Sequence, residues 1–510
     1  MSKGRVVMGL LFFPRGGSAQ VTRYLSIALG DAGWDVSLVA GSLGVAGEET
    51  HAPTFFGDTV LHYLDFTDAM REFEAGGSAV DAKVPMHPSY EDRDGAPDVL
   101  LAAVSPELGG RHTAVWEAPF RAAGADAVDV FHLHHLTPQH DTVEQQWPTT
   151  PVVAHLHGTE IKFLEEVERR AALAHSLGSS LADMADVAGT DFSASNLDEA
   201  SRELLISTRW EQWRHGEFWR DRLLAQAARA DHLVVVSPTD RATAVEILRT
   251  EPEYVTDVPN GVDVDRFCPR PMEPAERRAV FRRWLVEDPQ GWDETGAPGS
   301  VAYRDDDLDA LVGPEGDGTV LIYVGRFTHA KRVPSLVRAF ARARPEFENP
   351  ASLLIWGGHP GECETEHPVT VAREVGTEGI FFAGWRGHDD LPAALAACDA
   401  LVMPSVNDSF PQTPLEAMAV GLPVLATLSG GFPFMVNVDP AQPTGWLFPA
   451  EDEPALVAAL VEAVNQPADR LVRGRNALEY ARRTLSWGSR VAGFENAYER
   501  ARERRARRLL

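Results

Sequence analysis

The chain has 510 residues, of which 44% are hydrophobic, so it is long enough to bury at least two separate cores. Its formal net charge of −28 excludes non-specific binding to nucleic acid, because that binding needs a basic surface. Three cysteines without metal-type spacing fit a reducing compartment better than a disulfide scaffold. No apolar run approaches the about 18 residues that span a membrane. The apolar N-terminus continues into a loop and a helix instead of a cleavage site, so we expect a cytoplasmic protein.

The first half of the sequence alternates strands with helices. Residues 5–13 are predicted to form a buried strand and residues 14–19 a loop, and apolar residues then recur at helical spacing over 21–29. A second strand is predicted at 34–40. This β-α-β unit indicates a parallel sheet with helices on its faces. Further strands are predicted at 128–133, 151–155 and 232–236.

Long polar or helical stretches separate these strands. Residues 42–125 are rich in Asp, Glu, Gly and Pro and are predicted to form loops and short helices, whereas residues 160–230 are predicted to form long helices. Both stretches are candidates for shaping the site of an acceptor molecule. The turn at Pro259-Asn-Gly-Val-Asp263 indicates the end of a first domain, which we assign to residues 1–262.

A second domain is predicted after a linker, residues 263–318, whose part from residue 285 onward is predicted to be a surface insertion. We assign the second domain to residues 319–480 and expect a C-terminal helix over 481–510 to pack back on the first domain. Its strands are predicted at 320–324, 353–356, 380–383, 400–403 and 423–426. The fold class is therefore α/β, with two doubly wound domains facing across a cleft and ligands at the carboxyl ends of the strands.

Two loops at predicted strand ends have residues suited to a phosphate group. Gly16 and Gly17 follow the first strand, where the backbone can approach an anion at the start of a helix. A simple tight turn is the alternative explanation. In the second domain, Gly325 is followed by Arg326 and Lys331, whose cationic groups suit a diphosphate. Two solvated surface cations are the alternative there.

A third loop runs from Asp408 to Glu416, between a predicted strand and a predicted helix. Thr413-Pro-Leu-Glu416 fits a capping box with Thr413 as the N-cap, so Glu416 also has a purely structural explanation. Capping does not explain Asp408, which lies across the loop from that motif. Asp408 is therefore the stronger indication of a ligand.

These loops belong to a set of motifs that occur in order along the chain. The set is Arg15-Gly-Gly17, Pro259-Asn-Gly-Val-Asp263, Val324-Gly-Arg-Phe327 with Lys331, Pro404-Ser405, Asp408-x7-Glu416 with Ala417-Met-Ala, and Gly421-Leu-Pro-Val. Together the motifs resemble the retaining nucleotide-sugar glycosyltransferases of the GT-B fold, family 4 type. The resemblance covers nearly all of the second domain and the core strands of the first. It implies an enzyme that transfers a hexosyl group from a UDP- or GDP-sugar to an acceptor hydroxyl.

The resemblance also implies roles for individual residues. The implied catalytic residues are His157, Arg326, Lys331 and Asp408. The implied donor-binding residues are Gly16, Gly17, Arg326, Lys331, Arg386, Asp408, Ser409, Phe410, Thr413 and Glu416. In this scheme Arg326 and Lys331 hold the donor diphosphate and stabilise the departing nucleotide, Glu416 bonds the ribose, and Asp408 contacts the sugar. Neither a metal nor a cofactor is implied; the partners are the nucleotide sugar and the acceptor.

Three positions depart from the family pattern. Asp408 replaces the usual glutamate, Pro411 stands where glycine is usual and removes a backbone donor, and Phe434 lies where an acidic residue often follows paired glycines. The first two leave the identity of the donor sugar open, and we have no interpretation of the third.

The acceptor is expected to be small and soluble, because the sequence has neither a spanning segment nor a strong basic amphipathic helix near the first domain. Contact with a membrane surface is not favoured, and the sequence says nothing about oligomeric state. Four alternatives stay open: a lipid- or polysaccharide-directed transferase, a nucleotide-sugar epimerase, a sugar phosphorylase, and a non-catalytic binding protein.

For three other features of the sequence we favour a structural explanation over a functional one. The histidines are predicted to be polar strand-end residues lining the cleft and not a metal site; they are His132, His134, His135, His140, His155 and His157. The aromatic residues from Trp210 to Trp219 are predicted to be the core-facing stripe of a helix. The basic tail from Arg500 to Arg508 is predicted to be a solvated face.

Overall fold

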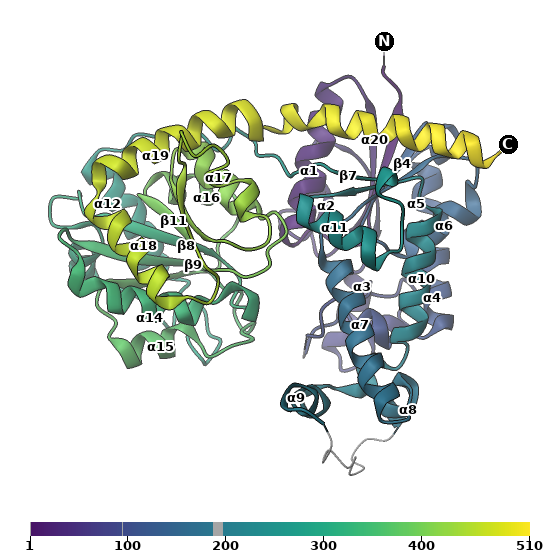
Figure 1. The fold of residues 1–510 in the computed structure, drawn as a ribbon, viewed down its shortest axis with the longest axis horizontal. Helices are drawn as coiled ribbons and strands as arrows, with labels where there is room; N and C mark the ends of the chain where they lie inside the picture. Colours follow the sequence, from purple (N-terminus) through teal and green to yellow (C-terminus); the bar gives the residue numbers. More distant parts are fainter. Residues whose placement is uncertain (1, 94, 187–196) are drawn as a thin grey trace. The chain divides into compact units, whose positions relative to one another are not determined.

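The structure is a computed structural model that describes residues 2–93, 95–186 and 197–510. The chain divides into two compact units (Figure 1): the first is Met1–Pro259 with Val491–Leu510, and the second is Asn260–Arg490. The division falls at the predicted turn. The segment predicted as a linker, 263–318, belongs to the second unit.

The first unit is built on a parallel sheet. Among the described residues this sheet has seven strands in the order β3-β2-β1-β4-β5-β6-β7. The bounds are β1 Arg5–Leu10, β2 Asp35–Ser42, β3 Val60–Asp65, β4 Val130–His134, β5 Val152–His155, β6 His232–Val235 and β7 Val255–Asp257. All five predicted strands of this half are present. The sequence did not predict β3 and β7, which lie at the two edges of the sheet and lack the continuous apolar run of a central strand.

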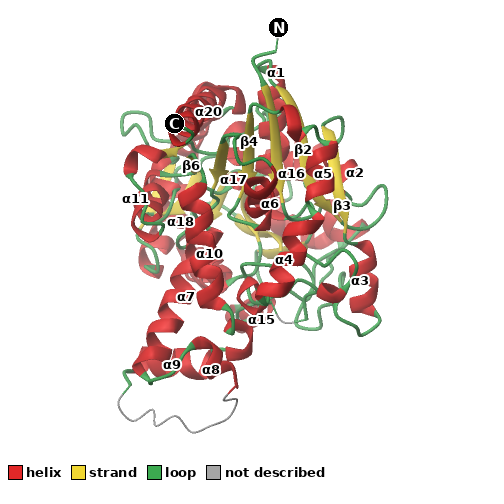
Figure 2. Cartoon of the chain, turned by 90° about the vertical axis from the view of Figure 1, so that its right-hand side faces the viewer, coloured by secondary structure: helices red, strands yellow, loops and turns green. Residues whose placement is uncertain are grey.

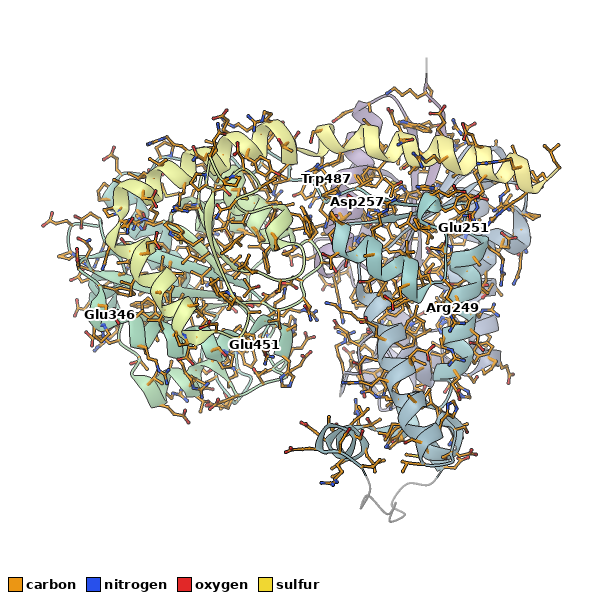
Figure 3. The ribbon with its side chains drawn as sticks, viewed as in Figure 1. Arg249, Glu251, Asp257, Glu346, Glu451 and Trp487 are labelled. Atoms are coloured by element: carbon orange, nitrogen blue, oxygen red, sulfur yellow. The ribbon has the colours of Figure 1, made fainter. Side chains whose placement is uncertain are left out.

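Helices cover the sheet and extend beyond it. Their bounds are α1 Gly16–Asp31, α2 Ala52–Phe56, α3 Thr67–Glu74, α4 Pro106–Val115, α5 Glu117–Ala122, α6 Pro138–Gln146, α7 Thr159–Ser176, α8 Leu181–Asp186, α9 Glu199–Ser207, α10 Gly216–Arg229 and α11 Pro238–Ile247. Figure 1 and Figure 2 show α8 and α9 at the far end of α7 from the sheet. Residue 94 of the stretch 42–125 and residues 187–196 of the stretch 160–230 lie outside the described residues.

The aromatic stretch of the first unit lies mainly in its core. Trp213 and Trp219 are buried and belong to one hydrophobic cluster with α7, while Trp210 and Phe218 are partly buried against it. The Nε1 atom of Trp219 donates to the carbonyl of Val104 at 2.7 Å. The core explanation predicted from the helical spacing is therefore confirmed for the two buried tryptophans.

The second unit has the strand order of a Rossmann fold. Its described part contains a six-stranded parallel sheet in the order β10-β9-β8-β11-β12-β13. The strands are β8 Thr319–Gly325, β9 Ala351–Gly357, β10 Ile380–Gly384, β11 Ala400–Met403, β12 Val424–Thr427 and β13 Gly445–Phe448. The helices are α12 Pro274–Arg282, α13 Leu308–Val312, α14 Val333–Ala343, α15 Pro368–Val375, α16 Leu391–Ala396, α17 Gln412–Val420, α18 Glu453–Asn465 and α19 Pro467–Tyr480. The predicted fold class, two doubly wound α/β domains, is confirmed.

The segment predicted as a surface insertion packs into the second unit instead. Gln290 forms a parallel bridge with Gly384 at the end of β10. Trp292 is 3% exposed and donates through Nε1 to the carbonyl of Gly358 at 2.7 Å, and the Tyr303 hydroxyl accepts from the backbone N–H of Phe382 at 2.8 Å. The prediction failed because the segment is rich in charged residues, and its packed aromatic residues, Trp292 and Tyr303, are too far apart to form a recognisable apolar pattern.

The basic tail belongs to a long helix, α20 Trp487–Arg508, and its arginines pack on the first unit. Arg505 is 6% exposed and donates to Asp231 at 2.9 Å and to the carbonyl of Pro148 at 2.6 Å. Arg508 donates to the other Asp231 oxygen at 3.0 Å. The predicted solvated face is therefore wrong at these residues, because a buried carboxylate lies under the helix. Among the described residues, no helix is both long and apolar enough to cross a membrane.

Candidate functional site

The two loops with the predicted donor residues follow adjacent strands of the second unit. β8 and β11 pair in parallel at the point where the strand order reverses, and ligands of such sheets bind beyond the strand ends at this point. The backbone N–H of Val406, after β11, donates to the carbonyl of Ala330, after β8, at 2.8 Å. This bond ties the two loops together.

Lys331 and Asp408 meet where the loops touch. The Lys331 ammonium lies 2.8 Å from Oδ1 and 2.7 Å from Oδ2 of Asp408, and the two side chains are only 17% and 16% exposed. The Tyr323 hydroxyl donates to the carbonyl of Arg326 at 2.9 Å. Burial first, and then the charge of Asp408, raises the pKa of Tyr323, so this phenol stays protonated. Arg326 is partly buried at the end of β8.

The Asp408 loop is held in an unusual backbone conformation. Asn407 has a φ of 57°, in a left-handed region that costs energy for most side chains. Gly431 donates its N–H to the carbonyl of Asp408 at 2.7 Å, and a Cβ atom at Gly431 would overlap the Ser409 carbonyl. Asn260 donates through Nδ2 to the carbonyl of Phe410 at 2.8 Å. The loop is therefore preorganised by its neighbours.

Phe410 enters the site through its backbone, and Ser409 through its side chain. The Phe410 ring is 4% exposed and lies in the core. Its carbonyl, as described above, accepts from Asn260. The Ser409 side chain is partly exposed beside Asp408. Of the two, only Ser409 has a side chain at the surface of the loop.

The predicted capping box around Glu416 is wrong. Helix α17 begins at Gln412 with Pro411 as its N-cap, and no side chain caps it. Thr413 is thus already inside the helix, where its hydroxyl cannot take the N-cap role. Glu416 is 3% exposed and has Oε1 3.2 Å from Nε2 of His388. Burial raises the pKa of Glu416 to about 8, opposed by the nearby charge of Arg266.

His388 is a site residue that the sequence did not indicate. It follows β10, the third strand whose end reaches this region, and contacts Glu416. The ring of Phe267 lies 5.3 Å from its ring, and Arg266 donates to its carbonyl at 3.1 Å. A polar residue just beyond a predicted strand end was the available signal.

The guanidinium of Arg386, a predicted donor residue, is held by the segment that follows α12. Its guanidinium donates to the carbonyl of Trp284 at 2.7 Å and to Asp288 at 3.0 Å, and its side chain is 5% exposed. The guanidinium also lies 6.0 Å from the ring centroid of Trp356. In this structure Arg386 fastens the segment after α12 to the sheet.

The predicted site residues of the first unit follow the carboxyl ends of two strands: Gly16 and Gly17 come after β1, and His157 comes after β5. Helix α1 begins at Gly16, which has a φ of 72°. A Cβ atom added at Gly16 or Gly17 would meet nothing within 4 Å, so the backbone of this turn is open to a ligand.

His157 lies after β5 in a stack of imidazoles. Its Nε2 lies 2.9 Å from Nδ1 of His134, and its backbone N–H donates to Glu160 at 3.0 Å. The other oxygen of Glu160 lies 3.2 Å from Nδ1 of His135, a residue with a φ of 62°. Burial lowers the pKa of His157 well below its ordinary value, so this ring is neutral near pH 7.

Comparison with known proteins identifies the second unit. Residues 318–466 match the model of the family described as "Glycosyl transferases group 1", so this part of the chain carries such a domain. The D-inositol 3-phosphate glycosyltransferase of Salinispora tropica is 30% identical over 280 residues, which are 54% of this chain and 52% of that protein. The chain thus spans about half the length of the curated relatives it matches.

Solved structures share the fold over nearly the whole chain. Sucrose-phosphate synthase from Thermosynechococcus elongatus has a TM-score of 0.60 at 19% identity and covers 98% of both chains. HepE of Anabaena, in complex with UDP, has a TM-score of 0.56 at 13% identity and covers 97% of this chain and 99% of its own. At these identities the likeness shows the fold alone.

Proposed function

We propose that this protein is a retaining glycosyltransferase that moves a sugar from a UDP- or GDP-sugar to a hydroxyl of a small soluble acceptor. The observation that carries the proposal is the pairing of Lys331 with Asp408 where the strand order reverses, inside a domain that matches the glycosyl transferases group 1 model. The complex of HepE with UDP and the name of the relative from Salinispora support the donor and acceptor classes.

The proposed donor-binding step exchanges one ion pair for another. A diphosphate approaching the β8 end meets Lys331 and Arg326, and the ammonium turns from Asp408 to the phosphate oxygens. Ammonium and guanidinium groups form their strongest hydrogen bonds to such anionic oxygens. Asp408, once released, is free to accept hydrogen bonds from hydroxyl groups of the donor sugar.

Glu416 is proposed to bind the ribose. A carboxyl with a pKa of about 8 is neutral in the ligand-free protein near pH 7, and it then has both a donor and an acceptor for the two ribose hydroxyls. Thr413 lies one turn before it on α17 and, with Ser409, supplies further hydroxyl groups to the donor. Arg386 is not included, since its guanidinium is held by Trp284 and Asp288.

In the proposed reaction the acceptor oxygen bonds to the anomeric carbon as the bond from that carbon to the diphosphate breaks. The proton of the acceptor hydroxyl passes to the departing phosphate oxygen on the same face, so the anomeric configuration is retained. Lys331 and Arg326 stabilise the charge that develops on the leaving group. No metal is required by this scheme. Gly16, Gly17 and His157 of the first unit are proposed to assist at the diphosphate and the donor sugar.

The first experiment measures nucleotide binding to the purified full chain. UDP, GDP and ADP, with their glucose derivatives, are titrated by calorimetry and by thermal unfolding. One base is expected to bind, and a ligand at a hundred times its Kd adds about 2.7 kcal/mol of stability. The Lys331→Met variant should bind the nucleotide more weakly, whereas Arg342→Met, which removes an exposed cation of α14, should bind it as the wild type does. If no nucleotide binds the wild-type chain, the proposal fails.

A second experiment identifies the reaction. The donor that binds is incubated with candidate acceptors, and the product is analysed by nuclear magnetic resonance. A product with the anomeric configuration of the donor supports the proposal, and an inverted product contradicts the mechanism. A changed donor without acceptor would indicate an epimerase, and dependence on inorganic phosphate would indicate a phosphorylase.

A further inference from the structure

A cluster of imidazoles lies on one face of the sheet of the first unit. Because side chains alternate along a strand, His132 and His134 point to the same face of β4, and the parallel register sets His155 of β5 beside His134. All three residues are 0% exposed. Side chains of α20 cover them: the ring of Phe494 lies 5.6 Å from that of His132 and 5.3 Å from that of His155.

The ring nitrogens of this cluster are arranged like metal ligands. One nitrogen from each of His132, His134 and His155 lies within 4.8 Å of the other two. The Nε2 atoms of His134 and His155 are buried and have no hydrogen-bond partner among the residues that the structure describes. A buried polar atom without a partner is costly, by roughly 1–3 kcal/mol, so each of these two atoms is available to a bound ion.

The opposite nitrogen of each ring is already anchored. His134 Nδ1 lies 2.9 Å from Nε2 of His157, and His155 Nδ1 lies 3.1 Å from Nε2 of His132. Metal-binding histidines in proteins are typically held in this way, with the second nitrogen bonded to a neighbour that fixes the ring and its tautomer. His134 and His155 therefore present their Nε2 lone pairs in fixed directions.

His132 becomes the third ligand when its Nε2 exchanges the bond to His155 for a bond to the metal. Its Nδ1 lies 2.7 Å from the hydroxyl of Tyr498 on α20, so the ring stays anchored when its Nε2 leaves His155 for a metal. The Glu160 carboxyl, fully buried beside His135, lies next to the cluster and offsets part of the charge that an ion would bring into the core.

We propose that His132, His134 and His155 bind one first-row transition metal ion, of which Zn²⁺ and Co²⁺ are the practical probes. Three imidazole nitrogens favour these ions over Mg²⁺ and Ca²⁺, which prefer oxygen ligands. The site belongs to the first unit alone, and its metal content can be measured without the proposed sugar transfer. Metal on Nε2 of His134 keeps the proton on its Nδ1, which then donates to Nε2 of His157 and fixes the orientation of that ring.

The test measures metal content in tag-free full-length protein. Because the ligands are buried, cells are grown with added Zn²⁺ or Co²⁺ so that metal enters during folding. The purified chain is dialysed against a chelator-free buffer and analysed by elemental mass spectrometry. We expect about one ion per chain, and the Co²⁺ protein should show the visible absorption of a nitrogen-ligated ion. Mg²⁺ in excess should not displace it.

Two substitutions test whether the cluster is the site that binds the metal. His134→Gln and His155→Gln should each lower the metal content at least tenfold, whereas His112→Gln, which changes a buried histidine of α4 outside the cluster, should leave it unchanged. Circular dichroism checks that each variant is folded. Fewer than a tenth of an ion per wild-type chain with both metals would overturn the proposal, even if a variant does not fold. Full metal content in both folded cluster variants would overturn it as well.

Discussion

Lys331 is bonded to both carboxylate oxygens of Asp408, at 2.8 and 2.7 Å, across two loops that lie 77 positions apart in the chain. The cation proposed to hold the diphosphate is thus held by the acid proposed to contact the sugar. A nucleotide that lacks the sugar must compete with Asp408 for the ammonium group, whereas a complete donor offers Asp408 new hydrogen bonds in exchange.

Changing the two partners should therefore have opposite effects on nucleotide affinity. Lys331→Met removes a charge-assisted hydrogen bond, so the Kd for the nucleoside diphosphate should rise roughly tenfold to a hundredfold. Asp408→Asn removes the competing charge, and the same Kd should stay unchanged or fall, while transfer of the sugar is lost. Calorimetry and a transfer assay measure the two effects. Equal loss of affinity in both variants would mean that the pair only holds the loops together.

The glycine pair behind the Asp408 loop gives a second prediction. In Gly431→Ala the new Cβ meets the Ser409 carbonyl, and overpacking of this kind costs about 1–3 kcal/mol. The loop should shift, and the Kd for the nucleotide should rise roughly tenfold. Thermal unfolding and calorimetry follow both quantities. In the matched variant Gly110→Ala, inside α4, the Cβ meets nothing within 4 Å. The Kd should stay unchanged there, and stability should not fall, because Ala favours a helix over Gly.

The central strands were predictable because strands buried on both faces are continuous apolar runs. β8 and β11 are of this kind, so the residues that follow them, Lys331 and Asp408, were expected at strand ends. Their contact was not predictable from spacing, because it depends on β8 and β11 being neighbours in the sheet. Edge strand β3, with exposed and half-buried residues only, gave no such signal.

The environment of Glu416 could not be predicted from the local sequence pattern around it. The capping motif predicted a hydrogen bond to its own helix, but α17 starts before Thr413. Glu416 is buried instead against His388, which lies 28 positions earlier by sequence number and comes from the loop after β10. Local propensity was overridden by a tertiary contact between helix α17 and the loop after β10.

Buried histidines should make the first unit sensitive to acid. Burial lowers the pKa of His112 to about 3 and that of His140 and His232 to about 4. Below pH 6.5 the unfolded chain takes up protons that the folded chain does not, so stability is present above this pH and is lost as the pH falls. Between pH 6.5 and its own lowered pKa, each of the three histidines reduces the free energy of unfolding by roughly 1.4 kcal/mol for each pH unit of acidification.

Urea unfolding between pH 4 and pH 7 measures this slope. His232→Gln keeps a side chain that can bond Thr256, the present partner of His232, and should flatten the slope by about one proton. His359→Gln changes an exposed histidine and should leave the slope as in the wild type. A stability that is constant from pH 7 to pH 4 would contradict the prediction.

Glu416 should have the opposite dependence on pH. Its pKa is about 8 in the folded protein against an ordinary 4.5. Below pH 4.5 the carboxyl is neutral in both states and costs nothing. As the pH rises from 4.5 to 8 the unfolded chain ionises first, so stability is lost progressively, by up to roughly 1.4 kcal/mol per pH unit. Above pH 8 the loss no longer grows.

Glu416→Gln replaces the carboxyl with a neutral group of the same shape, so the variant should lack this loss. The difference in unfolding free energy between variant and wild type should grow from pH 4.5 to pH 8 and then level off, with the variant the more stable. Comparison at each pH removes the contribution of the histidines, which both proteins share. Glu499→Gln, at an exposed position of α20, serves as the control and should show no growing difference. A difference for Glu416→Gln that is independent of pH would mean that His388 keeps the carboxylate ionised in the folded protein.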